Sequence, residues 1–342
     1  MKFSTTRVSS SELNEDNYVS TENMLQDFQG ILKAKSVPED VNVISFSCGD
    51  ILISNIRPYL KKVWKATFNG GCSSDVFVLQ ANDNIESDYL HYVVANDKFI
   101  NFVMSGAKGV KMPRGDKNQM KKYPLSLPQI QEQKKIGKML SLLDERIATQ
   151  NKVIDKLQYL IKGIAQHCIR ELINGWEYVK LGDICKITTG KLDANAQVEN
   201  GQYPFFTCAE RPFNIDSYAF DTEALLISGN GANLGYINYY KGKFNAYQRT
   251  YVLDHFSVNI QYVKWALKVL LPQRIAIEKS SSNTPYIVLS TLADLKIPIP
   301  NYSKQNHIAN LMMSFERKIS TQLALKDLYN KQKQYMLRQM FI

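Results

Sequence analysis

Apolar residues follow a seven-residue repeat in two long stretches of the chain. From Ile136 onward they recur in alternating steps of four and three, which is the seam spacing of a coiled coil. The second stretch begins at Ile308 and is weaker, because Lys326 and Lys333 occupy seam positions. We predict long helices over residues 129–171 and 301–341 that pair antiparallel through their seams. The residues expected to pair are Ile136, Leu140, Leu143, Ile147, Gln150, Ile308, Met312, Phe315, Ile319 and Gln322.

The two stretches belong to an internal repeat. Residues 119–170 reappear without a gap as residues 291–342, with Pro128 aligned to Pro300 and Gln133 to Gln305. A self-match of this length indicates two copies of one unit. Each copy is a variable region that closes on a strand, a Leu-Pro or Ile-Pro step and one long helix. A single apolar stripe is equally typical of a core face in a helical bundle, but two copies that each end a mixed domain favour a spacer.

The variable regions, which we call the first and second head, also resemble each other faintly. Residues 50–55 align with 224–229, and residues 75–79 with 249–253. Short β-prone segments broken by Gly and Asn predict a mixed sheet with long loops in each head. Helical patterns follow at 87–104 and 260–279. The second head opens at Trp176, and no matching opening is visible before Val19.

These patterns predict an α+β protein made of two pseudo-repeated mixed α/β domains. Each domain is followed by a long helix, and the two helices form an antiparallel coiled coil in which Gln150 and Gln322 can face each other and fix the register. The expected division is a first head over 1–122, a strand and helix over 123–172, a second head over 173–294, and a strand and helix over 295–342.

The chain is basic, with a formal net charge of +10. Two clusters of positive charge stand out, one over residues 57–65 beside Tyr59 and Trp64, and one over residues 108–122. Such clusters are often only solvated surface. Their recurrence in loops, interleaved with Asn, Gln and Tyr, favours contact with the phosphates and bases of DNA.

No catalytic constellation is apparent. Residues 283–286 (Asn-Thr-Pro-Tyr) resemble the Asn-Pro-Pro-Tyr motif of adenine-N6 methyltransferases but lack its first proline. Residues 229–235 are glycine-rich but lack the spacing and acidic residue of a dinucleotide-binding loop. The five cysteines show no C-x-x-C spacing, which argues against a zinc site and a disulfide framework. Without a signal peptide or a membrane-length apolar run, we expect a cytoplasmic protein.

Together these features resemble the specificity subunit of type I restriction-modification systems. The resemblance rests on the two variable heads, the opening at 176–183, and the Leu-Pro-x-x-x-x-Gln and Ile-Pro-x-x-x-x-Gln segments at 127–133 and 299–305. It covers nearly the whole chain. It implies two target-recognition domains that each read one half of a bipartite sequence in double-stranded DNA. The helices would set the gap between the halves and dock two methyltransferase subunits, which restriction subunits then join.

The same resemblance implies a non-catalytic chain that binds no cofactor or metal of its own. S-adenosylmethionine, ATP and Mg would be held by the partner subunits. Polar and basic loop residues of the heads are then the expected DNA contacts. They are Asn55, Arg57, Lys61, Lys62, Lys111, Arg114, Arg211, Asn230, Asn233, Gln248, Arg249, Asn283 and Tyr286.

Two other functions remain open at this point. An autonomous adenine-N6 methyltransferase would need a pocket for S-adenosylmethionine. A coiled-coil adaptor without DNA binding would use the helices alone and show no salt-sensitive interaction with DNA.

Overall fold

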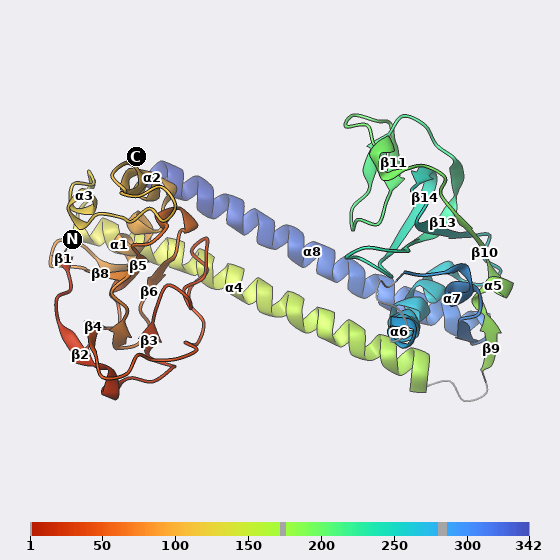
Figure 1. The fold of residues 1–342 in the computed structure, drawn as a ribbon, viewed down its shortest axis with the longest axis horizontal. Coiled ribbons are helices and arrows are strands. Elements are labelled where there is room, and N and C mark those ends of the chain that lie inside the picture. The colour runs from red at the N-terminus through yellow and green to blue at the C-terminus, as the bar shows by residue number, and fades with distance from the viewer. Residues whose placement is uncertain (1, 172–175, 280–285, 342) are drawn as a thin grey trace. The chain divides into compact units, whose positions relative to one another are not determined.

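The computed structural model describes residues 2–171, 176–279 and 286–341. The chain divides into two compact units. Unit 1 contains residues 1–151 and 324–342, and unit 2 contains residues 152–323. Each unit therefore combines one head with one end of each long helix, and both labelled chain ends belong to unit 1 (Figure 1).

Both predicted long helices are present. The first, α4 (Ile130–Gln166), continues into a π-helical turn, η3 (His167–Glu171), and the second is α8 (Tyr302–Met340). All the seam residues predicted to pair are buried or half-buried. Within unit 1 the two helices run antiparallel, since Asp144 contacts Lys333 and the Arg146 guanidinium lies 5.7 Å from the Tyr329 ring centroid. The Gln150 Oε1 atom is shielded from solvent without a hydrogen-bond partner among the described residues, and its pairing with Gln322 stays a prediction.

Lys333 does not weaken the seam in the way its charge suggests. Its Nζ atom lies 2.5 Å from Asp144 Oδ1 and 5.5 Å from the centroid of the Tyr92 ring. Tyr92 also donates a hydrogen bond to Asp144 Oδ2 at 2.8 Å. The lysine is therefore neutralised by the facing helix and covered by an aromatic ring of the first head.

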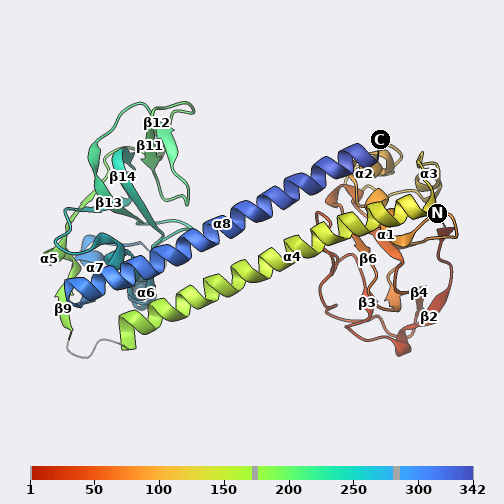
Figure 2. The same ribbon diagram turned by 180° about the vertical axis from the view of Figure 1, so that it is seen from behind.

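The first head is built from two small sheets and three short helices. One sheet has the strand order β1 (Lys2–Phe3), β8 (Val76–Gln80), β5 (Ile51–Ser54), β6 (Val63–Lys65). The other has the order β2 (Arg7–Ser9), β4 (Asn42–Phe46), β7 (Gly70–Cys72), β3 (Tyr18–Val19). The helices are α1 (Ser87–Val94), α2 (Asp97–Ser105) and α3 (Lys117–Lys121), with 3-10 turns η1 (Ser10–Glu12) and η2 (Pro58–Leu60). In both views α1 lies beside the first turns of α4 (Figures 1 and 2).

The second head has one six-stranded sheet. Its order is β10 (Lys186–Thr189), β15 (Thr250–Asp254), β13 (Phe220–Ser228), β14 (Ile237–Ala246), β11 (Tyr203–Phe206), β12 (Phe213–Ile215). A separate antiparallel pair joins β9 (Glu177–Lys180) to β16 (Lys296–Ile299). The helices are α5 (Leu181–Ile184), α6 (Ile260–Lys279) and α7 (Leu289–Ala293), with the 3-10 turn η4 (Ala194–Ala196).

The strand registers show that the two heads are copies of one fold. Leu52 pairs with Val78 in the first head, and Leu226 pairs with Val252 in the second, both shifted by 174 positions. The neighbouring pair, Ile53 with Val63, becomes Ile227 with Ile237 at the same shift. At this shift the long strand β13 corresponds to residues 46–54, from the last residue of β4 to the end of β5, and β14 corresponds to residues 63–72, which span β6 and β7. The repeat predicted from the sequence therefore extends through the sheets.

One expected element differs between the copies. A strand was expected before each long helix, but only the second copy has one, β16. Residues 123–129 have no strand assignment. The difference lies in the available pairing partner. In the second copy, Ile297 of β16 pairs with Val179 of β9. In the first copy, the first described strand, β1, pairs with β8 and not with residues 123–129. An extended segment without a ladder partner is not a strand.

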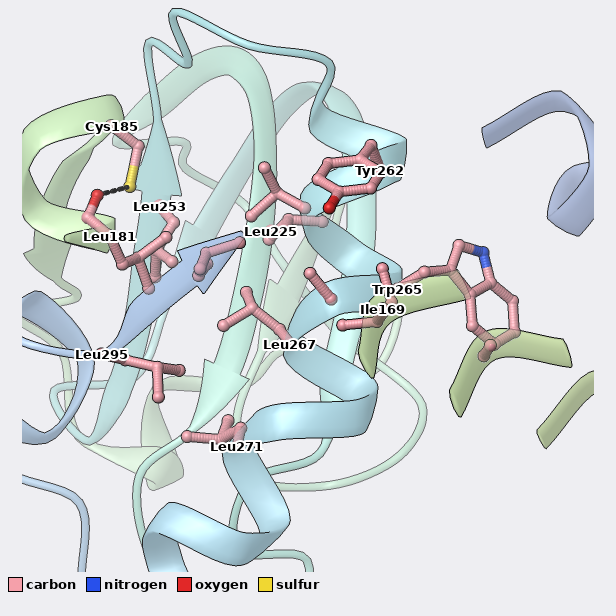
Figure 3. Close-up of a cluster of buried hydrophobic side chains, with 14 of the residues drawn as sticks. Ile169, Leu181, Cys185, Leu225, Leu253, Tyr262, Trp265, Leu267, Leu271 and Leu295 are labelled. Atoms are coloured by element: carbon pink, nitrogen blue, oxygen red, sulfur yellow. Dashed lines mark hydrogen bonds between the residues drawn. The ribbon is translucent and has the colours of Figure 1, made fainter. Parts of the chain in front are cut away.

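The core of unit 2 joins the head to both long helices. Tyr262, Leu267 and Leu271 of α6 face Leu225 and Leu253 of the sheet (Figure 3). Ile169 of η3, the turn that continues α4, and Met312 of α8 belong to the same buried cluster. Head and helix ends of this unit therefore share one apolar core, so the head is held on its helices by burial of nonpolar surface.

Candidate nucleic-acid interface

Three loops of the first head meet where strand β5 ends. The backbone N–H of Asn55 donates to Asp75 O at 2.9 Å, and Asn55 O accepts from the N–H of Gly115 at 2.7 Å. The N–H of Arg57 donates to Pro113 O at 2.7 Å. The segments after β5, before β8 and around residue 114 are thus joined by backbone hydrogen bonds into one group, which we call the loop junction of the first head.

The second head has the same loop junction. The N–H of Gly229 donates to Arg249 O at 2.8 Å, and Gly229 O accepts from the N–H of Ile287 at 2.9 Å. Gly229 and Arg249 correspond to Asn55 and Asp75 at the shift of 174 positions. These bonds bring Asn55 and Arg57 of the first head next to the loop of Arg114, and they bring Arg249 of the second head next to Gly229 and Ile287.

Backbone conformation explains how the chain turns sharply at these junctions. Arg57 and Lys61 adopt left-handed φ values of 49° and 54°, and Gly231 and Gly235 adopt 79° and 80°. Glycine adopts such angles without strain, whereas a residue with a Cβ is strained there. At Gly229 space is also limiting, because an added Cβ would lie 2.5 Å from Arg249 O.

The candidates of the first head divide into exposed and engaged side chains. Arg57, Lys111 and Arg114 are exposed at the loop junction. Lys61 forms an ion pair with Asp97 at 2.8 Å, and the Lys62 Nζ donates to the Thr21 carbonyl at 2.6 Å. The structure thus places Lys61 and Lys62 in contacts that stabilise the head itself.

Asn55 is a special case among these candidates. Its side chain is buried, and the Oδ1 atom has no hydrogen-bond partner among the described residues. A buried amide oxygen without a donor is unfavourable by roughly 1–3 kcal/mol. Asn55 is therefore placed at the centre of the junction but is not available on its surface.

In the second head, four candidates share the exposed face of the junction or its rim. Gln248, Arg249 and Tyr286 are exposed, and Asn230 is half-buried. Asn233 is engaged, since its Nδ2 donates to Cys208 O at 3.1 Å and so ties down the loop that carries the exposed Arg211. Asn283 lies outside the described residues.

Two features of the junctions were missed by sequence reasoning. Asp75 forms an ion pair with Arg114, Oδ1 to Nη1 at 3.1 Å. The sequence did contain an indication that position 75 matters, because Asp75 aligns with the cationic Arg249 in the repeat. The second is a cavity of about 370 Å³ in the first head, whose lining includes Asn23, Lys33, Ser73 and Asp75. It was not detectable from the sequence, because these residues are brought together by strand pairing.

Two buried cysteines are unreactive, and the described residues include no cluster of metal ligands. Burial raises the pKa of the Cys72 and Cys185 thiols to about 12, so both are neutral near pH 7 and not nucleophilic. In the described parts of the chain, no group of three or more His, Cys, Asp or Glu could hold a metal ion. The described helices include none that is long and apolar enough to cross a membrane.

Each long helix is joined to its own head by a buried glutamine. Gln133 Nε2 donates to Pro128 O at 2.9 Å, and Gln305 Nε2 donates to Pro300 O at 2.8 Å. Gln305 Oε1 accepts from the backbone N–H of Asn259, just before α6, at 3.0 Å. The Pro-x-x-x-x-Gln segment of the repeat is thus a joint that fixes the start of the helix against the head.

The sequence model of the type I restriction modification DNA specificity domain matches residues 5–159 and again residues 173–327. These two matches cover most of the chain. The chain belongs to this family. Its repeat is therefore a pair of specificity domains, as the sequence predicted, and the family is that of the non-catalytic specificity subunits of type I restriction-modification systems.

The chain is similar to specificity subunits of known type I restriction enzymes. The chain is 45% identical over 134 residues to the type I restriction enzyme EcoDI specificity subunit of Escherichia coli, a match that covers 39% of this chain and 30% of that protein. It is 24% identical over 318 residues to the MjaVIII specificity subunit of Methanocaldococcus jannaschii, covering 78% of this chain and 72% of that one.

A solved structure has the same fold. The crystal structure of the type I restriction-modification S subunit from M. genitalium superimposes with a TM-score of 0.68 at 17% identity, covering 98% of this chain and 96% of that chain. A second solved structure, of a type I R-M system, gives a TM-score of 0.58 at 19% identity over 99% of this chain and 98% of that one. At these identities the likeness concerns the fold. It agrees with the predicted fold class of two mixed domains, each with a long helix.

Proposed function

We propose that each head reads one half of a bipartite DNA sequence through its loop junction. The observation that carries the proposal is the recurrence of the same three-loop junction in both heads, with exposed polar and basic side chains on each. A duplicated reading surface suits a DNA target made of two separate halves. Within the family of specificity subunits, this makes the heads target-recognition domains.

The charges of the junctions fit this role. Arg57 and Lys111 in the first head, and Arg249 in the second, are exposed, and none of them forms an ion pair within the described parts of the chain. Unpaired cations attract phosphates and release condensed counterions when they bind. Exposed Asn, Gln and Tyr side chains beside them can donate and accept hydrogen bonds at base edges.

The long helices have a second part in the proposal. They dock the methyltransferase subunits, which we expect to be two, and they set the number of unread base pairs between the half-sites. The exposed faces of α4 and α8 carry apolar side chains that the heads leave uncovered, including Tyr159, Leu328 and Tyr335. Restriction subunits would join this core. S-adenosylmethionine, ATP and Mg would be bound by the partner subunits.

Methylome sequencing tests the proposal directly. Cells that express the chain with its methyltransferase subunits should carry methylated adenines in one split sequence. Replacing residues 176–294 by the second head of another specificity subunit should change one half of that sequence and leave the other half intact. A swap that changed both halves together would contradict the assignment of one half-site to each head.

The same system separates the two rival functions. A purified chain that transfers methyl groups from S-adenosylmethionine without any partner subunit would point to an autonomous methyltransferase. A chain that binds its partners but shows no salt-dependent affinity for DNA in the assembled complex would point to a coiled-coil adaptor.

A further inference from the structure

Arg114 differs from Arg57 and Lys111, the other exposed cations at the loop junction of the first head, because a carboxylate holds it. Arg114 Nη1 lies 3.1 Å from Asp75 Oδ1, and the two side chains are 56% and 32% exposed. The backbone of Arg114 is also fixed, since its N–H donates to Lys108 O at 2.9 Å and its carbonyl accepts from the N–H of Lys108 at 3.1 Å. Main chain and side chain are therefore both positioned before any ligand arrives.

The backbone of Asp75 is also fixed by a hydrogen bond. Its carbonyl accepts from the N–H of Asn55 at 2.9 Å, and it stands one residue before strand β8. Asp75 and Arg114 thus come from two of the three loops of the junction. The ion pair joins these loops at the surface on which the DNA is proposed to lie.

A neighbouring carboxylate is unsuited to phosphate binding but suited to base reading. A phosphate is anionic, so Asp75 would repel it and weaken any contact that Arg114 makes with the DNA backbone. Base reading instead requires a guanidinium in a defined orientation, because the preferred arginine contact is two parallel hydrogen bonds to O6 and N7 of guanine. The ion pair joins one guanidinium nitrogen, Nη1, to Asp75. The other N–H groups of the guanidinium stay available to donate hydrogen bonds to a base.

We propose that Arg114 reads a guanine in the half-site of the first head, and that Asp75 is the positioning residue that orients its guanidinium. This inference rests on the proposed function, since it requires DNA at the loop junction. It assigns different roles to neighbouring cations. Arg114 determines specificity, whereas Lys111, three residues away and exposed, contributes phosphate attraction without base preference.

The second head has different residues at the equivalent positions. Arg249 replaces Asp75, and Tyr286 replaces Arg114. Both are exposed. The second junction therefore has a cation where the first has its anion, and the two heads should read different bases at corresponding points of their half-sites.

The experiment uses the full chain assembled with its methyltransferase subunits, and the probes are genomic DNA and duplexes of the methylated sequence. Four variants are compared with the unchanged chain: Arg114→Lys, Arg114→Ala, Asp75→Asn and Lys111→Ala. Arg114→Lys keeps the charge and removes the planar fork, so DNA affinity should persist while discrimination at one G·C pair falls about tenfold or more. Arg114→Ala should lose the same discrimination together with some affinity.

Asp75→Asn and Lys111→Ala separate positioning from attraction. Asp75→Asn should relax the same G·C pair to a smaller extent without lowering affinity, because it removes a negative charge. Lys111→Ala should weaken binding uniformly, reduce the salt dependence and leave the methylated sequence unchanged. If Arg114→Ala fails to fold, the Arg114→Lys variant still gives the test, because its assembly with the methyltransferase subunits can be checked by purifying the complex.

The outcomes distinguish this inference from the proposed function. A first half-site without any G·C pair, or an Arg114→Lys variant that methylates an unchanged sequence, would overturn the role of Arg114 while two-headed reading stands. The absence of any methylated split sequence with the unchanged chain would overturn the proposed function, and this inference with it.

Discussion

Gln133 accepts a hydrogen bond from the backbone N–H of Glu86, with its Oε1 atom 2.9 Å from the nitrogen. The same side chain donates to the carbonyls of Asn84 and Pro128 at 3.0 and 2.9 Å. Only 1% of Gln133 is exposed. One residue of the long helix α4 therefore satisfies three backbone groups. Two of them, at Asn84 and Glu86, lie in the segment that leads into α1, and the third, at Pro128, lies at the start of the helix. These bonds fix the angle at which the helix leaves the first head.

Gln133→Ala should destabilise unit 1 by about 1–3 kcal/mol, because it leaves the Glu86 N–H and two carbonyls, all in partly buried hydrogen bonds, without their partner. Chemical denaturation of the full chain measures the change. Gln131→Ala is the matched control, since Gln131 is exposed two residues earlier on the same helix. Equal stabilities of the two variants would show that the joint is satisfied by water or by backbone rearrangement.

Lys333→Ala should destabilise the chain by about 1–2 kcal/mol, because it removes the partner of a half-buried Asp144 and the cation above Tyr92. Lys331→Ala provides the comparison, since Lys331 forms an exposed i,i+4 pair with Asp327 and should cost less than about 0.5 kcal/mol. Thermal unfolding of both variants gives the ranking. The reverse order would mean that the seam tolerates an unpaired Asp144.

Stability should fall below pH 6.5 because of His91. Burial and the nearby Lys333 lower the pKa of His91 from 6.5 to about 4, and its Nδ1 atom is shielded without a hydrogen-bond partner among the described residues. Between these two pKa values the unfolded chain binds a proton that the folded chain does not, so stability decreases as the pH falls. The groups facing His91 are Lys333, Asp144, Lys65 and Asp88.

His91→Leu should therefore flatten the stability profile between pH 6.5 and pH 4, by at most about 3 kcal/mol at the acid end. Unfolding free energies at pH 7 and pH 4.5 for both chains give the comparison. An identical slope in the variant and the unchanged chain would assign the acid sensitivity to the carboxylates instead.

A four-residue insertion within α4 should lengthen the unread spacer by one to two base pairs. It adds about 6 Å and slightly more than one turn, which keeps the apolar seam roughly in phase. Base pairs are spaced about 3.4 Å apart along each strand. A two-residue insertion should instead rotate the seam by about 200° and abolish assembly. Methylome sequencing reads the spacer, and a soluble, active four-residue variant with an unchanged gap would mean that the helices dock partners without measuring DNA.

The sequence alone determined the long helices, the duplication and the family. Heptad spacing from Ile136 and from Ile308 is a local property, because side chains three and four residues apart share one helix face whatever the rest of the chain does. Likewise, the alignment of Gln133 with Gln305 required no contact to be known. The same pattern showed where Lys333 lies in the seam, but not that Asp144 on the other helix neutralises it.

Only the tertiary structure decided which polar residues are free to act. Lys61 and Arg57 look equivalent in sequence, yet Lys61 is paired with Asp97 and Arg57 is exposed at the loop junction. Residues 123–129 have the same pattern as the strand β16 but no partner with which to form a ladder. Ion pairs and strand ladders depend on segments distant in the chain, so their formation is settled by packing and cannot be deduced from local spacing.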